Sequence, residues 1–144
     1  MKTLTSLIVV ASAHQVEIFE RVGTADKFNL NLVSKFDAEL DSNHEKPDRT
    51  FNSVGVLRHG VEPHTDRRDV EIHKFVEKIA INLLELDKTK KYDDLILIAS
   101  HQIISELEKN LHHHLKEKIS HKLAKDLVKF DASELKKYLV DHKI

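Results

Sequence analysis

The chain of 144 residues has no cysteine, only three glycines and only two prolines. Without cysteine it forms no disulfide bond and has neither a thiolate nucleophile nor a cysteine-based zinc site. With three glycines it has no glycine-rich loop of the kind that holds phosphate groups. Its formal net charge is −1, so no overall basicity directs it towards nucleic acid or anionic membranes. Disulfide-stabilised folds and phosphate-loop enzymes are therefore excluded.

Long hydrophobic runs are absent as well, since no segment approaches the roughly 20 apolar residues of a membrane span. The first residues resemble a secretory signal peptide, with an early lysine, the apolar run Leu4 to Ala11 and small residues at 11–13. Thr5 and Ser6 interrupt this run, however, and its strongly apolar centre is only Leu7 to Val10. That length and its β-branched content predict a buried first β-strand instead. We therefore expect a cytoplasmic protein with no membrane partner.

The remaining composition is that of a globular protein, with 40% hydrophobic and 33% charged residues. Neither an internal repeat nor a linker divides the chain, so we expect one domain over residues 1–144. Three strands are predicted in the first third: Leu4 to Ala11, Gln15 to Val22, and Phe28 to Phe36. In the last of these strands, one face should contain Phe28, Leu30, Leu32 and Phe36. Because only short turns separate these strands, they should form an antiparallel meander.

A long loop is predicted from about residue 37 to 65, because the periodicity ends there and turn-forming residues accumulate. Loops of this length in compact domains are often functional. A helix then begins near Asp66, where Asp66 and Asp69 suit its positive end. Its buried stripe is predicted to consist of Ile72, Phe75, Val76, Ile79, Ala80, Leu83 and Leu86.

Shorter elements are predicted in the second half. The uniformly apolar run Leu95 to Ala99 predicts a central strand, and apolar residues from Ile103 to Leu111 predict a second helix. Alternation from Ile119 to Leu123 predicts a more exposed last strand, and capping-box spacing from Asp131 to Glu134 predicts a terminal helix. The order β-β-β-α-β-α-β-α predicts an α/β fold with a mixed five-stranded sheet packed by helices, because strand–helix–strand crossovers are parallel and right-handed.

Five stretches carry a resemblance to the bacterial host attachment protein family. They read LIVVASAHQVEIFE (7–20), DRTFNSVG (48–55), RHGVEPHTDRRDVEIHKFVEKIA (58–80), YDDLILIAS (92–100) and KDL (125–127). The family's fold is similar to the middle domain of archaeal and eukaryotic class I peptide chain release factors. The resemblance therefore implies an RNase-H-like layered sheet and an association with translation.

The chain also departs from the family pattern. In release factors a Gly-Gly-Gln tip in the loop before the long helix enters the peptidyl-transferase centre. This chain contains no Gly-Gly-Gln, and its corresponding loop spans Asn52 to Gly60, so peptide release by that chemistry is not expected. Ser12 stands where the family commonly has Asp, and Ser100-His101 replaces its usual Pro-Pro. Ser105 and Glu108 occupy the positions of a customary Gly and Arg, so any ligand pocket that these positions form in relatives has changed here.

Cationic and aromatic side chains in and after the long loop are candidate RNA or ligand contacts. Guanidinium groups hold phosphate bidentately, an aromatic ring can stack on a base, and loop histidines can act as acid–base groups. The candidates are Arg49, Phe51, Arg58, His59, His64, Arg67 and Arg68. The alternative is that Phe51 packs the loop onto the core and that the arginines pair with nearby acids.

A second basic group lies near the predicted last strand and contains Lys118, Lys122 and Lys125. These lysines could contact RNA phosphates, with an affinity that falls steeply with salt. Lysines on an exposed edge strand equally protect it against edge-to-edge pairing. Both interpretations stay open.

Eleven histidines raise the question of a metal site. His112, His113 and His114 are adjacent, but neighbouring residues on a helix point about 100° apart and cannot all bind one ion. A solvated helix end, whose negative dipole suits imidazolium, explains them. Ser100 beside His101 is the nearest approach to a nucleophile–base pair. We predict no catalytic residue, no metal and no cofactor.

The sequence thus leaves three hypotheses for function. The first is a non-catalytic binding module that associates with the ribosome or with structured RNA through its arginine-bearing loop. The second is a protein–protein adaptor involved in host attachment. The third is a small hydrolase that uses His59 and His64. The ligand and the oligomeric state are left open.

Overall fold

The computed structural model describes residues 4–24, 27–38 and 63–144, with only the backbone for 63–69. Three strands come first: β1 (Leu4–Ala11), β2 (Gln15–Gly23) and β3 (Phe28–Asp37). The second half contains α3 (Pro63–Thr89), β4 (Asp94–Ala99), α4 (His101–Asn110), α5 (His113–Lys116), β5 (Ile119–Ala124) and α6 (Ala132–Asp141). The predicted order of strands and longer helices is confirmed.

The strands form one mixed sheet in the order β3-β2-β1-β4-β5. β2 pairs antiparallel with both β1 and β3, whereas β1 and β5 both run parallel to β4. β2 therefore runs against the other four strands. The predicted antiparallel meander and parallel crossovers are confirmed, and with them the α/β, RNase-H-like layered fold.

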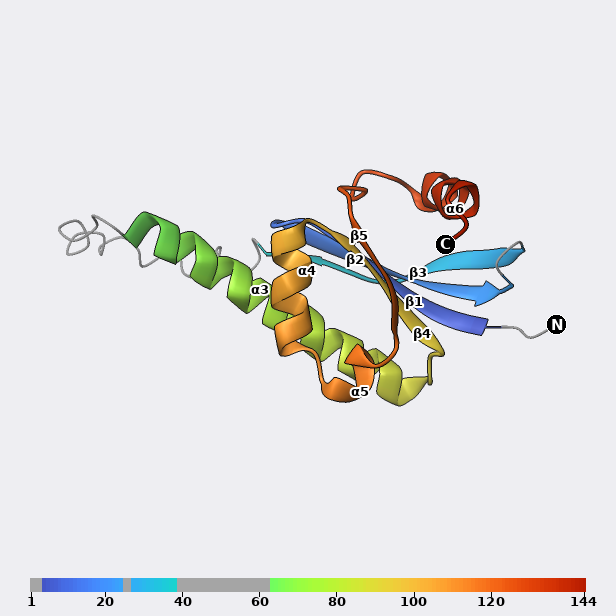
Figure 1. The fold of residues 1–144 in the computed structure, drawn as a ribbon, viewed down its shortest axis with the longest axis horizontal. Helices are drawn as coiled ribbons and strands as arrows, with labels where there is room; N and C mark the ends of the chain where they lie inside the picture. Colours follow the sequence, from blue (N-terminus) through green and yellow to red (C-terminus); the bar gives the residue numbers. More distant parts are fainter. Residues whose placement is uncertain (1–3, 25–26, 39–62) are drawn as a thin grey trace.

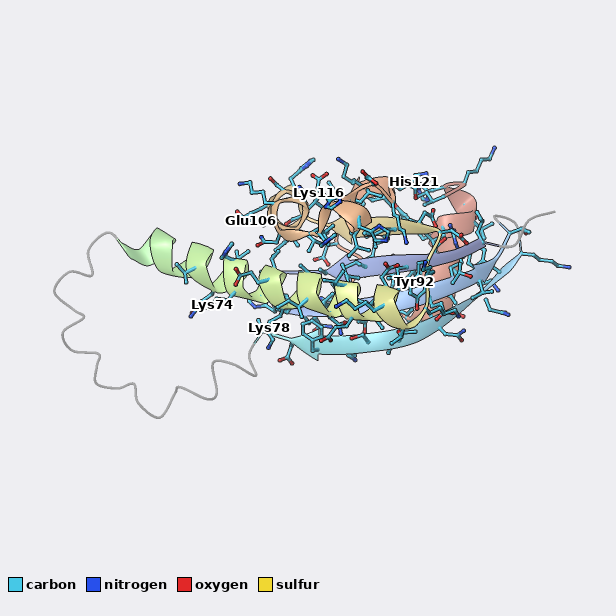
Figure 2. The ribbon with its side chains drawn as sticks, turned by 90° about the horizontal axis from the view of Figure 1, so that it is seen from below. Lys74, Lys78, Tyr92, Glu106, Lys116 and His121 are labelled. Atoms are coloured by element: carbon cyan, nitrogen blue, oxygen red, sulfur yellow. The ribbon has the colours of Figure 1, made fainter. Side chains whose placement is uncertain are left out.

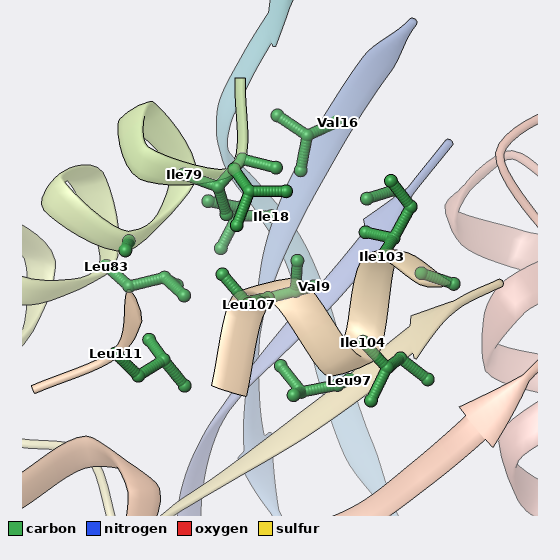
Figure 3. Close-up of a cluster of buried hydrophobic side chains, with 14 of the residues drawn as sticks. Val9, Val16, Ile18, Ile79, Leu83, Leu97, Ile103, Ile104, Leu107 and Leu111 are labelled. Atoms are coloured by element: carbon green, nitrogen blue, oxygen red, sulfur yellow. The ribbon is translucent and has the colours of Figure 1, made fainter. Parts of the chain in front are cut away.

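Helices cover both faces of the sheet, which explains why residues 7–11 of β1 and 95–99 of β4 are all apolar (Figure 1). On one face, Leu7 and Val9 of β1 pack with side chains of α3, α4 and α5, as in the cluster of Figure 3. On the other face, Ile8 and Val10 pack with Leu135 and Leu139 of α6. Alternate residues of the central strands therefore enter two different cores.

Both edge strands change faces at a bulge, and this differs from the simple alternation predicted. In β3, Ser34 pairs with Ile18 and Leu32 with Phe19, so Val33 is the extra residue. Phe28 and Leu30 accordingly pack on the α6 side and Phe36 on the α3 side, whereas the alternation predicted that they share a face.

In β5 the extra residue is Ser120, because Ile119 pairs with Leu95 and His121 with Ile96. Ile119 consequently packs on the α3 side and Leu123 on the α6 side. Each edge strand also carries a lysine, Lys35 in β3 and Lys122 in β5. A bulge with a lysine protects an edge against further strand pairing.

Two helix boundaries also differ from the prediction. α3 begins at Pro63 rather than near Asp66, so His64 lies in the first helical turn and not in the loop. Proline suits this position, because its missing N–H would have no partner there. α4 ends at Asn110, and Leu111 follows as an extended C-cap (φ −73°, ψ 143°). The adjacent histidines therefore belong to the start of the short helix α5 rather than to the end of α4.

Candidate functional site

The predicted contact residues divide into those the structure places and those it does not. Arg49, Phe51, Arg58 and His59 lie outside the described residues, so their roles stay predictions. Arg67 and Arg68, with His64, lie in the N-terminal turns of α3. These turns extend beyond the sheet, away from the other helices (Figure 1). The helix first buries a described side chain at Ile72.

Asp87, near the C-terminal end of α3, is the most enclosed carboxylate among the described residues, with 7% of its surface exposed. The Lys118 ammonium lies 3.0 Å from its Oδ1, and the His114 Nε2 lies 3.3 Å from its Oδ2. The backbone N–H of Tyr92 donates to Oδ1 over 3.4 Å. One carboxylate thus connects α3 with α5 and with the residue that precedes β5.

Burial alone would raise the pKa of Asp87. The hydrogen bonds from Lys118 and the Tyr92 backbone, with the charges of Lys118 and His114, outweigh that effect, and the pKa of Asp87 lies below its ordinary value. The pairing also has a consequence for Lys118, which was predicted to contact RNA. Its side chain is only 19% exposed, so a phosphate would have to compete with Asp87 for it.

Tyr92 lies beside the end of α3 (Figure 2), and its side chain links this region to β2. Its hydroxyl donates to Glu20 Oε1 over 3.4 Å, and Lys90 forms an ion pair with the same glutamate. Burial, then the negative charge of Glu20 and the hydrogen bond to it, raise the pKa of Tyr92 to about 12. Together with Asp87, these contacts hold the end of α3 against the sheet, which is a structural role.

The two other predicted lysines lie in different surroundings. Lys122 in β5 pairs with Glu108 of α4 at 2.9 Å, with side chains 49% and 36% exposed. Lys125 follows directly after β5 and is exposed. Of the three predicted lysines, Lys118 is therefore held most tightly by the fold.

Serines at the ends of two central strands form turns and caps. Ser12, after β1, accepts hydrogen bonds at its Oγ from the backbone N–H groups of His14 (3.1 Å) and Gln15 (3.2 Å). Aspartate side chains form the same kind of turn. Ser100 accepts from the backbone N–H of Ile103 over 3.3 Å and caps α4. The Ser100 hydroxyl, next to His101, is thus the N-cap of α4.

A hollow of about 310 Å³ lies between α4 and β5, near the carboxyl ends of β4 and β5. Its volume is at the lower limit of small-molecule sites, and its position is typical of ligand sites in α/β sheets. The side chains that line it are His101, Ile104, Ser105, Glu108, Lys122 and Ala124. Three of these, His101, Ser105 and Glu108, are positions at which the resemblance described above predicts other residues. Only Lys122 was among the predicted contact residues.

The three adjacent histidines have separate roles. The His112 ring stacks on that of His113 with centroids 4.6 Å apart, and His112 Nδ1 accepts the backbone N–H of His114 over 3.1 Å. His114 itself faces Asp87. Among the side chains that the structure describes, those of residues 4–24, 27–38 and 70–144, no group of three or more histidines or carboxylates could hold a metal ion. Nor does any helix in these ranges have the length and apolar character that spanning a membrane requires.

Asp87 was not among the residues predicted from the sequence, although the sequence contains a signal for it. Asp87 follows Leu83 by four residues and Ile79 by eight, so it lies on the buried stripe of α3. The predicted stripe included Leu86 instead, which is only half-buried. An acid at a stripe position indicates a buried partner, because an unpaired buried charge is costly.

Comparison with known proteins found one matching family model and one similar protein. Residues 7–139 match a family model described as "Protein required for attachment to host cells". An uncharacterised protein of Rickettsia prowazekii (strain Madrid E) is 27% identical over 140 residues, which cover 93% of this chain and 91% of that protein. The family match begins in β1 and ends in α6, so it includes both cores, the Asp87 cluster and the hollow.

Proposed function

The chain belongs to the family of proteins required for attachment to host cells, and from this premise we propose that it is a non-catalytic, cytoplasmic binding module that contacts ribosomal or other structured RNA. The contact is made by arginines at and before the start of α3, among them Arg67 and Arg68. This proposal extends the family assignment, which by itself names a requirement for attachment and no molecular partner.

The observation that carries the proposal is the projection of α3 beyond the sheet (Figure 1). A helix of 27 residues is about 40 Å long, whereas the six residues of β4 span about 20 Å. The N-terminal turns therefore extend away from the folded body, and they contain Arg67 and Arg68. Guanidinium groups on a projecting helix end can reach phosphates in a groove of folded RNA.

Two-metal nucleases hold their cations with clustered carboxylates beside the central strands, whereas the carboxylates at the start of β4 bond to groups of the neighbouring strands. Asp93 Oδ2 accepts the backbone N–H of Thr5 over 2.8 Å. Asp94 accepts the hydroxyl groups of Ser6 and Ser120, the latter over 2.8 Å. Both acids are thus engaged in joining β4 to its neighbours β1 and β5.

Co-sedimentation of the full chain with ribosomes tests the proposal. Binding through two phosphates should weaken by about tenfold for a fourfold rise in salt, and RNase treatment should release the protein. Replacing Arg67 and Arg68 by alanine should weaken binding and flatten its salt dependence, and adding Arg49→Ala and Arg58→Ala should weaken it further. The matched control removes Lys88 and Lys91, two exposed cations at the other end of α3. Binding that resists salt and RNase, or that survives the arginine changes, would reject RNA contact and favour a protein adaptor.

A further inference from the structure

The hollow between α4 and β5 arises from a regular arrangement of side chains. His101, Ile104, Ser105 and Glu108 follow the i, i+3, i+4, i+7 spacing of one helix face. Opposite them on β5 lie Lys122 and Ala124, which are two residues apart and share a strand face. Because Ser105 and Ala124 are small, they do not fill the space between helix and strand. Ile104, 7% exposed and shown beside Leu97 in Figure 3, supplies apolar surface.

The polar groups of the hollow place a hydrogen-bond donor beside an acceptor. The Lys122 ammonium lies 2.9 Å from Glu108 Oε2, and both side chains are substantially exposed. An exposed ion pair contributes little to stability. A ligand that accepts from the lysine and donates to the glutamate can therefore insert between them at small cost.

We propose that this hollow binds a guanine base. Guanine has a carbonyl oxygen, O6, next to two N–H donors, at N1 and at the 2-amino group. O6 accepts from Lys122, while the two donors make parallel hydrogen bonds to the Glu108 carboxylate. Adenine, cytosine and uracil each present one donor group beside an acceptor, so they form a single hydrogen bond to the carboxylate. The pair of charges therefore favours guanine.

The size and walls of the hollow agree with one planar base. About 310 Å³ holds a single heterocycle, and the Ile104 and Ala124 side chains offer apolar contact. The His101 ring, at the start of α4, is available for stacking, as aromatic side chains are in the recognition of unpaired RNA bases. This inference rests on the proposed RNA-binding function. It adds a second contact on the protein, at which an unpaired guanine of the RNA is recognised. Lys125 is exposed and directly follows Ala124, which lines the hollow. Its ammonium group is therefore a candidate contact for a phosphate next to the bound base.

Backbone amide NMR of the full chain tests the inference with guanosine, inosine and adenosine monophosphates. Inosine is the matched ligand, because it lacks only the 2-amino group. We expect guanosine monophosphate to shift the amides of Ser105, Glu108 and Ala124, with a dissociation constant on the order of 1 mM. Inosine monophosphate should bind about tenfold more weakly. Equal binding of the guanosine and adenosine nucleotides, or no shift around the hollow, would overturn the proposal.

Two variants provide the protein controls. Glu108→Gln keeps the shape of the side chain and should lower guanosine monophosphate affinity by about tenfold. Glu117→Gln removes an exposed acid outside the hollow and should leave affinity unchanged. Circular dichroism establishes that both variants are folded. An unchanged affinity in Glu108→Gln would contradict the assignment of the site.

The source of the base is decided with a five-nucleotide RNA that has one guanosine among uridines. If this RNA binds more tightly than the mononucleotide and in a salt-dependent way, the guanine is part of RNA. If both bind equally, the site serves a free nucleotide. Guanosine monophosphate binding does not involve Arg67 and Arg68, whereas ribosome co-sedimentation depends on them. Failure of this inference is thus distinguishable from failure of the proposed function.

Discussion

The Asp87 carboxylate near the end of α3 accepts a hydrogen bond from the Lys118 ammonium over 3.0 Å, although 31 residues separate the two in the chain. The pair joins the helix that precedes β4 to the segment that leads into β5. His114, 3.3 Å from the same carboxylate, adds α5 to the junction. One buried acid therefore joins α3 to α5 and to the segment that leads into β5.

Replacing that acid should destabilise the protein strongly. In Asp87→Asn the Lys118 ammonium loses its counter-charge in a mostly buried position, and we expect the free energy of unfolding to fall by about 3 kcal/mol. Urea denaturation measures the change. Glu85→Gln is the matched control, because Glu85 is exposed on the same helix, and it should change stability by less than about 0.5 kcal/mol. A similarly small effect of Asp87→Asn would show that the pair contributes nothing to stability.

The same carboxylate should make stability depend on acid pH. The pKa of Asp87 is lower in the folded protein than its ordinary value. Its stabilising contribution is therefore complete above about pH 4 and is lost as the pH falls through the folded pKa. Unfolding free energies measured from neutral to acid pH should show wild type and Asp87→Asn converging below about pH 4. A constant difference across that range would contradict the assignment.

Ionisation of Tyr92 should lower the stability of the folded protein at alkaline pH. Its pKa is raised to about 12 in the folded protein, compared with about 10 in an unfolded chain. Its contribution is therefore present below about pH 10 and is lost as the pH rises towards 12. Tyrosinate absorbance should show a step near pH 12 that is absent in Tyr92→Phe. If Tyr92→Phe leaves that step in place, the step belongs to another group.

Gly23 should not tolerate a side chain. Its φ of 140° is one that L-residues rarely adopt. A Cβ there would clash with the carbonyl oxygen of Lys27 and lie 2.7 Å from the Cα of Phe28, both backbone atoms. We expect Gly23→Ala to lower the free energy of unfolding by about 2 kcal/mol or more. Ser105→Ala, at an exposed helical position, is the control, and equal stability of the two variants would be evidence against strain at this turn.

Several elements could be predicted from local pattern alone. The apolar runs of β1 and β4 indicated strands covered on both faces, and both are buried by helices. The capping box at the start of α6 is present, with Asp131 and Glu134 each bonded to the other's backbone. These signals are reliable because a strand's burial and a helix's cap depend on neighbouring residues in the chain.

The faces of the edge strands could not be predicted in this way. Alternation in β3 assigned Phe36 to the same face as Phe28, but the bulge at Val33 separates them. The bulge at Ser120 does the same in β5. A single extra residue reverses every later side chain, and whether it occurs depends on the partner strand and on the helices packed against the sheet.

The sequence by itself determined the number and type of the principal elements, the mixed sheet and the family, because hydrophobic period, capping and motif similarity are properties of contiguous residues. Only the tertiary structure decided that Lys118 is held by Asp87, and that Glu108 and Lys122 meet at the edge of a hollow. Those relationships join segments distant in the chain. Their distances follow from how helices and strands pack together, and local sequence does not specify that.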